Sequence, residues 1–429
     1  MDHLAENHIL TDSQHGFREG RSCLTNLLET LETWMEILDQ KDGLDVAYLD
    51  FRKAFDLVSH QHLLYKMSKY GITQQVLNWV TSFLHERTQR VVIRGTASEP
   101  FDVTSGVPQG SVLGPVLFLI YINDLPLEVI SPVSLFADDS KVFSRIISEK
   151  NKKRNTKKGI SNINGNEILQ RDLDNIGEWA DRWKMEFNVD KCKIMHLGYT
   201  NPKHTYSMGG ADLTVTSKEK DLGVLIDDEL KFDSHIKEIV NKANRMLGLI
   251  KIAFAGIDKV MFKNIYPVLI RPQLEYCVQV WSPHLVKDIK LLEGVQRRAT
   301  KLVPELRNLP YEERLERLEL TTLTQRRHRG DMIQTYKLLT RKEDINPDKL
   351  FKLARRGRGN GLKIYKKRFH TDVRKFHFSQ RVINPWNKLK RKVVLVDKTS
   401  TFKLGFDGSQ AASIARRARA RDTNRYGCM

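Results

Sequence analysis

Cysteine is scarce in this chain of 429 residues: its four copies lie far apart, and none belongs to a Cys-x-x-Cys pair. A disulfide framework and a cysteine-rich zinc site are therefore both disfavoured, and a reducing intracellular compartment fits. Long hydrophobic runs are also lacking. The longest, Val112–Ile122, has 11 residues, well short of the roughly 20 that cross a bilayer. The acidic N-terminus has no apolar signal-peptide core, so we expect neither secretion nor a membrane partner.

Acidic residues are rare in one part of the chain, residues 351–400, which hold 16 Lys and Arg but two acids, Asp372 and Asp397. The whole chain carries a net charge of +19, so this segment supplies most of the excess. A basic segment attached to a nearly neutral body favours a polyanionic partner, above all nucleic acid. The alternative is a solvated basic tail with no defined ligand. Hydrophobic residues at 40% and charged residues at 29% indicate a globular protein.

Apolar residues recur at helical spacing in some segments and cluster at strand length in others. Ser22 can cap a helix that runs to Leu38, and Ser59 can cap a helix that ends at Gly71. Further helices are expected at residues 76–84, 115–123 and 169–183, and strands at residues 44–51, 90–94, 133–136 and 141–143. This mixture predicts an α+β fold that resembles a split β-α-β unit.

The second half of the chain has a different pattern. Residues 150–165 (KNKKRNTKKGISNING) have no periodicity and predict an exposed loop or insertion. Two short strands, at residues 193–197 and 222–226, precede a helical region from about residue 233 to 339. Glycine and arginine dominate after residue 355, and residues 409–429 have the composition of a tail.

Three acidic residues stand directly beside predicted buried strands. Asp50 ends the first strand, and Asp138 and Asp139 occupy the tip of a predicted hairpin. An unpaired buried carboxylate is costly, and neighbouring carboxylates repel one another unless a cation lies between them. Mg²⁺ prefers such oxygen ligands together with substrate phosphates. Each aspartate alone is typical of a solvated turn, but two strand-end sites in the order strand, helix, helix, hairpin favour a metal site.

Six motifs, in order along the chain, resemble those of the reverse transcriptases of non-LTR (LINE-type) retrotransposons, of the jockey or chicken-repeat kind. They are HGFREGRS (15–22), YLDFRKAFD (48–56), SGVPQGSVLGPVLFLIYINDL (105–125), FADDSK (136–141), NVDK (188–191) and DLGVLID (221–227). Residues 266–339 resemble the thumb and post-thumb region of such elements. The resemblance covers about residues 10–340 and extends more weakly to about residue 405.

The resemblance implies an RNA-directed DNA polymerase of right-hand architecture, which extends a primer 3′-end on an RNA template. Its partners would be an RNA template, a DNA primer or target and dNTPs, in the nucleus and in cytoplasmic ribonucleoprotein. The implied regions are partial fingers (1–43), a palm (44–230) with an inserted loop (150–165), a helical thumb and post-thumb region (231–340), a basic C-terminal region (341–408) and a tail (409–429).

The same resemblance assigns the catalytic residues. Asp50, Asp138 and Asp139 become the catalytic carboxylates, with Asp50 and Asp138 bridging the metals and the Phe51 carbonyl as a backbone ligand. The implied cofactors are two Mg²⁺ ions, with Mn²⁺ as an alternative, which can activate a 3′-hydroxyl and stabilise the leaving pyrophosphate. Lys191 would protonate that pyrophosphate, and a solvated lysine is the alternative.

Two residues are implied to recognise the nucleotide. Phe55 would be the ribose gate, whose ring clashes with a 2′-hydroxyl and so favours dNTPs over ribonucleotides. Outside the motif, Phe55 would be interpreted as a plain core aromatic. Arg18 would face the triphosphate, for which a forked guanidinium is suited. The alternative for Arg18 is an ordinary surface arginine.

Two loops are implied to position the substrates. Gln109 and Gly110 lie in a sharp loop, where the backbone and the amide can approach the incoming base pair. The alternative for Gln109 is an ordinary turn glutamine. Leu222 and Gly223 would mark the hairpin that grips the primer end, and Gly223 is otherwise a simple turn glycine.

Several departures from the family pattern bear on activity. In the family, a finger motif with an Arg-Pro-Ile core and an endonuclease domain normally precede HGFR, and we find neither before His15 in this sequence. Ser140 stands where the family usually has threonine. We therefore expect a truncated or decayed element copy. The chief alternative function is a catalytically inactive RNA-binding remnant of a retrotransposon polymerase. An intron maturase or a telomerase-like polymerase is disfavoured by the combination of FADDSK with DLGVLID and by the lack of a recognisable maturase domain.

Overall fold

The computed structural model describes residues 1–157, 164–254, 256–354 and 361–410. The chain divides into two compact units. Unit 1 comprises Met1–Asn26, Glu36–Gly223 and Asp227–Glu229, and unit 2 comprises Leu27–Met35, Val224–Ile226 and Leu230–Met429. Among the described residues, no helix is both long and apolar enough to span a bilayer. The predicted tail lies outside the described ranges from residue 411 onward.

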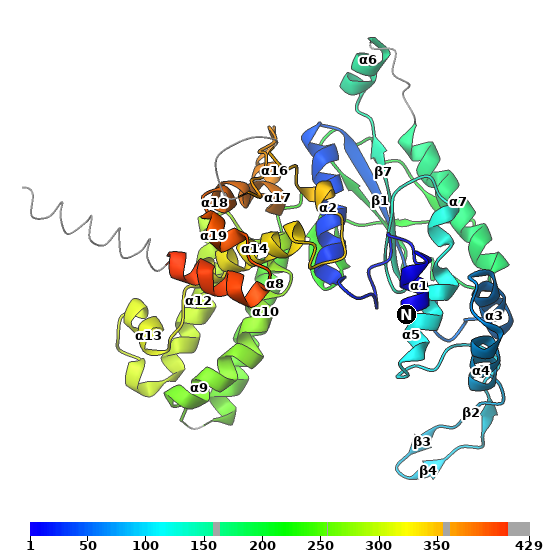
Figure 1. Ribbon diagram of the computed structural model, residues 1–429, viewed down its shortest axis with the longest axis horizontal. Helices are drawn as coiled ribbons and strands as arrows, with labels where there is room; N and C mark the ends of the chain where they lie inside the picture. The colour runs from blue at the N-terminus through cyan, green and yellow to red at the C-terminus, as the bar shows by residue number, and fades with distance from the viewer. Residues whose placement is uncertain (158–163, 255, 355–360, 411–429) are drawn as a thin grey trace, which may run out of the picture. The chain divides into compact units, whose positions relative to one another are not determined.

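Unit 1 is built on a five-stranded sheet with the strand order β11-β8-β1-β7-β6. Figure 1 labels β1 and β7 of this sheet. The strands are β1 (Gly43–Leu49), β6 (Val133–Phe136), β7 (Asp139–Ile146), β8 (Lys193–Leu197) and β11 (Thr214–Val215). The buried strand β1 pairs antiparallel with both β7 and β8. Its register places Leu49 opposite Ser140, so the end of β1 meets the start of β7. The strands predicted at 44–51, 133–136 and 141–143 are confirmed.

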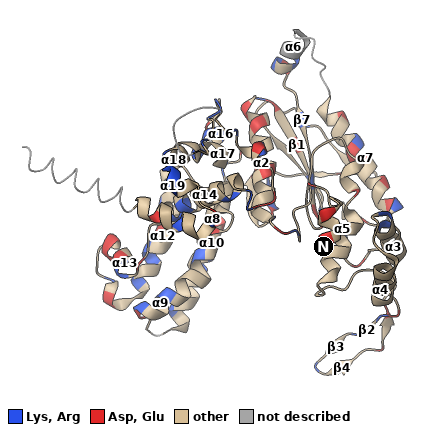
Figure 2. Ribbon diagram, in the orientation of Figure 1, with Lys and Arg blue, Asp and Glu red and all other residues tan. Residues whose placement is uncertain are grey.

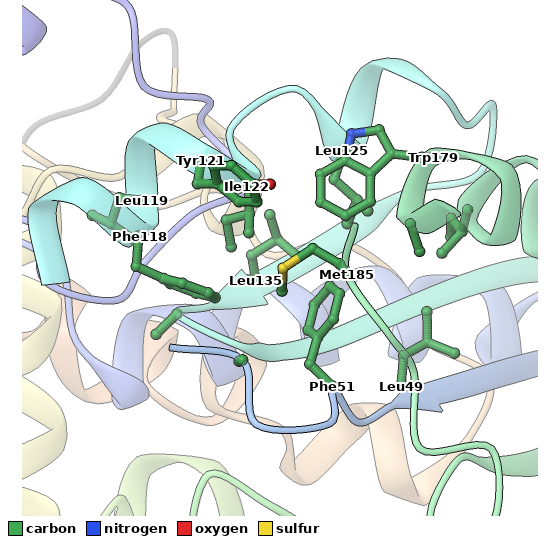
Figure 3. Close-up of a cluster of buried hydrophobic side chains, with 14 of the residues drawn as sticks. Leu49, Phe51, Phe118, Leu119, Tyr121, Ile122, Leu125, Leu135, Trp179 and Met185 are labelled. Atoms are coloured by element: carbon green, nitrogen blue, oxygen red, sulfur yellow. The ribbon is translucent and has the colours of Figure 1, made fainter. Parts of the chain in front are cut away.

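Apolar helices supply the core of unit 1. The larger ones are α3 (His60–Lys69), α4 (Gln74–Leu84), α5 (Leu113–Ile122) and α7 (Gly165–Arg182). Residues 117–122 of α5 are all buried, so the longest apolar run of the sequence forms a core helix. Phe51 meets Trp179 of α7 edge-on, with 6.3 Å between ring centroids (Figure 3). Leu135 of β6 belongs to the same buried cluster.

Two predicted helix caps are confirmed. Ser22 begins α2 (Cys23–Asp39) with a capping box, in which the Ser22 and Thr25 side chains each accept from the other's backbone N–H. The Ser59 side chain accepts from the backbone N–H of His62 at the start of α3. These bonds satisfy N–H groups that have no partner within a helix.

The strand predicted at 90–94 is shorter in the structure. Only Val92–Ile93 (β3) pairs, with Thr96–Ala97 (β4), because Arg94 and Gly95 turn the chain with φ of 50° and 85°. The remaining short elements of unit 1 are α1 (Asp2–Glu6), β2 (Thr88–Gln89), β5 (Phe101–Asp102), β9 (Ser207–Met208), β10 (Ala211–Asp212) and β12 (Lys218–Asp221).

Two other elements differ from the predictions. The prediction of a loop at residues 150–165 is wrong for its first half, because residues 149–157 form the helix α6 (Glu149–Lys157). Residues 158–163 of that stretch lie outside the described ranges. The strand predicted at 222–226 begins later, as β13 (Val224–Asp227), because Leu222 and Gly223 form a turn.

Unit 2 contains the helical region predicted at residues 233–339. Its longer helices are α8 (Asp233–Ala253), α9 (Lys259–Ile265), α12 (Val286–Ala299), α13 (Tyr311–Arg317) and α14 (Leu323–Leu339). The shorter helices are α10 (Arg271–Glu275), α11 (Val278–Trp281), α15 (Pro347–Leu350), α16 (Asp372–Phe376), α17 (Phe378–Arg381), α18 (Ile383–Asn387) and α19 (Arg391–Val394), and residues 399–410 are also helical. Tyr336 stacks on Phe402 with 4.4 Å between centroids, and Trp386 is fully buried. The described part of the basic segment therefore contributes to an apolar core.

Part of the basic charge is buried in unit 2. Arg374 donates to Glu32 Oε1 at 2.6 Å, and His377 Nε2 lies 3.3 Å from Glu32 Oε2. Burial alone would raise the pKa of Glu32, but His377 and Arg374 lower it to about 2. Burial lowers the pKa of His377. Arg374 is thus an ion-pair partner within the fold, whereas Arg391 and Lys392 of α19 are exposed. Figure 2 marks the Lys and Arg positions along the ribbon in blue.

Candidate active site

The predicted catalytic aspartates meet at one edge of the sheet in unit 1. Asp50 follows β1, Asp138 lies in the two-residue turn between β6 and β7, and Asp139 opens β7. Because β1 and β7 are neighbours and Leu49 lies opposite Ser140, the three carboxylates gather at the same end. Asp50 and Asp139 line one hollow of about 160 Å³. We call this hollow the aspartate crevice.

Burial and the negative charges of neighbouring carboxylates raise the pKa of Asp138 and Asp139. Partial burial raises the pKa of Asp138, and the negative charge of Asp50 raises it further. Partial burial, followed by the charges of Asp138 and Asp221, raises the pKa of Asp139 to about 6. The negative charges of Asp138, Asp221 and Asp50 therefore add to the effect of burial at Asp139. The site concentrates negative charge that the described side chains compensate only in part.

Asp50 is held by the loop that precedes β8. Its backbone N–H donates to Cys192 Sγ at 3.4 Å, and its carbonyl accepts from the Asn188 N–H at 2.8 Å. The carboxylate atom Oδ2 is buried and accepts no hydrogen bond from any residue that the structure describes. Lys191 Nζ lies 3.4 Å from this oxygen, and the Lys191 side chain is 67% exposed. The NVDK motif thus brings Lys191 to the sheet edge where the aspartates gather.

The aspartate hairpin is supported by the first motif and the residues just before it. Gln14 Oε1 accepts from the N–H groups of Gly16 at 2.7 Å and Ala137 at 2.9 Å. A Cβ on Gly16 would stand 2.4 Å from the Ala137 nitrogen. Ala137 adopts φ of 54°, a left-handed conformation that these contacts hold in place. Sequence reasoning missed Gln14, whose only signal was its position directly before HGFREGRS.

A buried ion pair forms the other wall of the aspartate crevice. Lys141 Nζ of β7 lies 2.6 Å from Asp221 Oδ2 of β12, and both side chains are about 5% exposed. Tyr48 lines the same wall; burial raises the pKa of its hydroxyl, and that hydroxyl has no hydrogen-bond partner. These residues lie inside or beside the quoted motifs, but no sequence pattern indicated that they converge. Leu222 also lines the crevice, in a turn where it and Gly223 adopt φ of 45° and 84°.

The loop with Gln109 is hydrogen-bonded to the last residues of the first aspartate motif, YLDFRKAFD. Gln109 Nε2 donates to Asp56 Oδ1 at 2.9 Å, and the Val107 N–H donates to the Phe55 carbonyl at 2.8 Å. Gly106 adopts φ of 87°, and a Cβ there would lie 2.8 Å from the Asp56 backbone. Gly110 also has a left-handed φ, of 84°.

The other predicted site residues lie outside the lining of the aspartate crevice. Phe55 is half-buried and stacks on Phe118 with 4.4 Å between centroids. Phe51 is buried and stacks on Phe187 at 4.2 Å. Arg18 donates to the Thr11 carbonyl at 2.6 Å, so its guanidinium is directed to the local backbone. The structure therefore brings together Asp50, Asp138, Asp139, Lys191 and Leu222, but not Arg18 or Phe55.

The donor set at the crevice fits a divalent cation. Within the described parts of the chain, no three His, Cys, Asp or Glu side chains already form a cluster that could hold a metal ion. However, Asp50 Oδ2 is buried without a hydrogen bond, and the pKa of both hairpin carboxylates is raised. Oxygen ligands with uncompensated charge are what Mg²⁺ prefers.

A family model described as reverse transcriptase (RNA-dependent DNA polymerase) matches residues 1–250. The chain belongs to the reverse transcriptase family. This membership confirms the resemblance read from the six motifs and accounts for the mixed α+β fold of unit 1.

Among curated proteins, this reverse transcriptase chain is similar to polymerases of mobile elements. It is 28% identical to the RNA-directed DNA polymerase from mobile element jockey of Drosophila funebris, over 71% of this chain and 34% of that protein. It is 27% identical to the probable RNA-directed DNA polymerase from transposon X-element of Drosophila melanogaster, over 69% of this chain and 32% of that protein. The chain spans about a third of the length of these relatives. It is therefore related to the reverse transcriptases of non-LTR retrotransposons.

A solved structure of apo telomerase from Candida tropicalis aligns with 68% of this chain and 47% of that chain, at 11% identity and a TM-score of 0.37. This likeness is too distant to bear on the function of the reverse transcriptase chain.

Proposed function

We propose that this chain is an RNA-directed DNA polymerase that extends a primer 3′-end on an RNA template with dNTPs. The observation that carries the proposal is the meeting of Asp50 with Asp138 and Asp139 at one sheet edge, where burial and neighbouring negative charges raise the pKa of Asp138 and Asp139. Such a cluster of strand-end carboxylates suits phosphoryl transfer, in which positioning and charge stabilisation supply most of the catalysis.

Asp50, Asp138, Asp139 and the Phe51 carbonyl would hold two Mg²⁺ ions, or Mn²⁺ in their place. When bound, such ions activate a 3′-hydroxyl and stabilise a leaving pyrophosphate. Lys191 lies 3.4 Å from Asp50 and is largely exposed, so its ammonium can reach a leaving group in the crevice and donate a proton there.

The nucleotide and the primer would be positioned by neighbouring motifs. Phe55 would exclude a 2′-hydroxyl, and Gln109 and Gly110 would approach the base pair from a loop that Asp56 holds in place. The turn at Leu222–Gly223 would contact the primer end. Arg18 would have to leave the Thr11 carbonyl to reach a triphosphate.

The proposed architecture is a right hand of partial fingers (1–43), palm (44–230), thumb and post-thumb region (231–340) and a basic C-terminal region (341–408). Its partners would be an RNA template, a DNA primer or target and dNTPs. The proposed place of action is the nucleus and cytoplasmic ribonucleoprotein.

Primer extension by the purified chain tests the proposal. An RNA template annealed to a DNA primer is incubated with dNTPs and Mg²⁺. Asp50→Asn and Asp138→Asn should each abolish extension while RNA binding survives, because each variant removes metal-binding charge and leaves the basic residues intact. Asp212→Asn, at an exposed position on β10, is the matched control and should extend normally.

Two outcomes would overturn the proposal. Full extension by Asp50→Asn or Asp138→Asn would show that the aspartates are not catalytic. If the unchanged chain bound RNA but never extended a primer, the catalytically inactive RNA-binding remnant would be the correct function.

A further inference from the structure

A second pocket, of about 130 Å³, lies in unit 2 and belongs to no part of the proposed polymerase site. Three arginines of α14 line it: Arg326, Arg327 and Arg329. A water molecule needs only about 10–15 Å³ of such space, so the pocket can admit a small tetrahedral anion. We call it the arginine pocket.

Two of its arginines are already neutralised. Arg326 forms a bidentate pair with Glu275, in which Nη2 lies 2.9 Å from Oε2. Arg329 forms a bidentate pair with Asp407 at 2.7 and 2.8 Å. Fork-to-fork pairs of this kind hold a guanidinium in a fixed orientation. The two arginines therefore form a rigid rim of N–H donors.

Arg327 is different because its guanidinium is buried and forms no ion pair with a described residue. Its residue surface is 5% exposed, Nη2 donates to Thr324 Oγ1 at 3.0 Å, and Nη1 has no hydrogen-bond partner among the described residues. Burial lowers the pKa of Arg327, whereas the negative charges of Glu293, Asp331 and Glu275 raise it. Asp331 is itself paired bidentately with Arg381. A buried guanidinium without an ion-pair partner is costly, and an anion in the pocket would offset that cost.

A glycine keeps the arginine pocket open. Gly330 lies inside α14, where glycine weakens a helix relative to alanine. A Cβ at this position would stand 3.0 Å from Gln279 Nε2, which lines the same pocket. The open space and the buried guanidinium are thus separate features of one site.

We propose that the arginine pocket binds a phosphate group, with the charge of Arg327 supplying the attraction and the rim supplying N–H donors. The phosphate belongs either to a nucleic-acid backbone or to free inorganic phosphate, which share this chemistry. The backbone source rests on the proposed polymerase function, whereas phosphate binding itself does not, because no crevice residue takes part in it.

Thermal unfolding of the full chain tests binding directly, with inorganic phosphate as the probe and sodium chloride of equal ionic strength as the reference. Phosphate should raise the Tm of the unchanged chain in a concentration-dependent way, since a ligand that binds only the folded state stabilises it. Arg327→Met should abolish this rise. Its Tm without phosphate should equal or exceed that of the unchanged chain, because the variant removes a buried charge that forms no ion pair with a described residue.

Two further variants separate binding in the arginine pocket from a general effect of removing an arginine. Gly330→Ala keeps every charge and favours the helix, but it narrows the pocket, so it should also lose the phosphate-dependent rise. Arg317→Gln removes an arginine whose side chain is 49% exposed and which pairs with Glu313 on α13, and it should respond like the unchanged chain.

The second measurement identifies the source of the phosphate. The affinity for single-stranded RNA is measured against salt concentration, where each neutralised phosphate contributes about 0.7 to the logarithmic slope. A slope reduced by about that amount in Arg327→Met supports backbone phosphate. An unchanged slope, in a variant whose Tm no longer responds to phosphate, supports free phosphate. The proposal is overturned if the unchanged chain shows no phosphate-specific rise in Tm, or if Arg327→Met and Gly330→Ala both retain it.

Discussion

Lys141 and Asp221 form a buried ion pair, with 2.6 Å between Nζ and Oδ2, although 80 residues separate them in the sequence. Lys141 is two residues beyond Asp139 on β7, and Asp221 directly precedes the Leu222–Gly223 turn. The pair therefore connects the aspartate hairpin to the segment proposed to contact the primer end.

Breaking this pair should destabilise the protein strongly. Lys141→Met leaves Asp221 buried without a cation, a change that typically costs about 3–5 kcal/mol. Urea unfolding measures the loss, and Lys141→Met combined with Asp221→Leu should recover much of it. Arg182→Met breaks the exposed pair with Glu128 and should cost no more than about 1 kcal/mol. Equal losses in the two single variants would contradict the importance of the buried pair.

Phe55→Ala should raise the incorporation of ribonucleotides relative to deoxyribonucleotides, because it removes the ring proposed to meet a 2′-hydroxyl. The ratio of the two kcat/KM values measures this. Phe83→Ala, which removes another half-buried aromatic that stacks on Trp79, is the control and should leave the ratio unchanged. If Phe55→Ala also leaves it unchanged, the stacking of Phe55 on Phe118 is its whole role.

Gly106→Ala should destabilise the loop that carries Gln109. The new Cβ would stand 2.8 Å from the Asp56 backbone, and φ is 87°; a left-handed conformation alone costs a residue with a Cβ roughly 1–2 kcal/mol. Gly177→Ala on α7 is the matched control, because nothing lies within 4 Å of its Cβ. That control should be neutral or stabilising by up to about 1 kcal/mol. Chemical unfolding of both variants checks the contrast.

Acid should destabilise unit 2 through Glu32 and His377. The folded pKa of His377 is lowered from 6.5, so its contribution to stability is present above about pH 6.5 and is lost as the pH falls below that value. The folded pKa of Glu32 is lowered from 4.5 to about 2, so its contribution is lost as the pH falls from about 4.5 towards 2.

Unfolding free energies measured between pH 8 and pH 4 check this pH dependence. His377→Gln cannot take up a proton in this range, so its stability should fall less steeply below about pH 6.5 than that of the unchanged chain. The difference between the two curves isolates His377 from the other histidines. Parallel curves would mean that His377 does not titrate differently in the folded and unfolded states.

RNA affinity should depend on the exposed charge of the basic segment. Deleting the segment would remove buried side chains such as Phe378 and Trp386, so neutralisation is the cleaner change. Lys388, Lys390 and Lys392 are exposed. Replacing all three with glutamine should reduce the slope of log affinity against log salt concentration by about 0.7 for each phosphate that these lysines neutralise. Arginine at the same positions retains the charge and should retain the slope. An unchanged slope with glutamine would identify these lysines as solvated surface.

The local structure of unit 1 was predictable because it depends on neighbours in sequence. The Ser22 cap, the buried strand β1 and the β6–β7 hairpin each follow from a side chain or a period within a few residues. The prediction for residues 90–94 was wrong in extent because Arg94, a non-glycine residue, adopts a positive φ that no sequence pattern indicated. Part of the predicted loop at 150–165 is the helix α6 for a similar reason, since that segment has no apolar period to reveal it.

The sequence by itself determined the family, the order of the motifs and which carboxylates stand at strand ends. The tertiary structure alone decided their partners: Gln14 beneath the hairpin, Lys141 against Asp221, and Glu32 with Arg374, 342 residues away. It also distinguished Arg327, whose charge is buried without an ion-pair partner among the described residues, from Arg326 and Arg329, which are paired. The physical reason is that patterns of hydrophobicity and turn residues act over short spans, whereas desolvation and charge pairing depend on which distant segments come together.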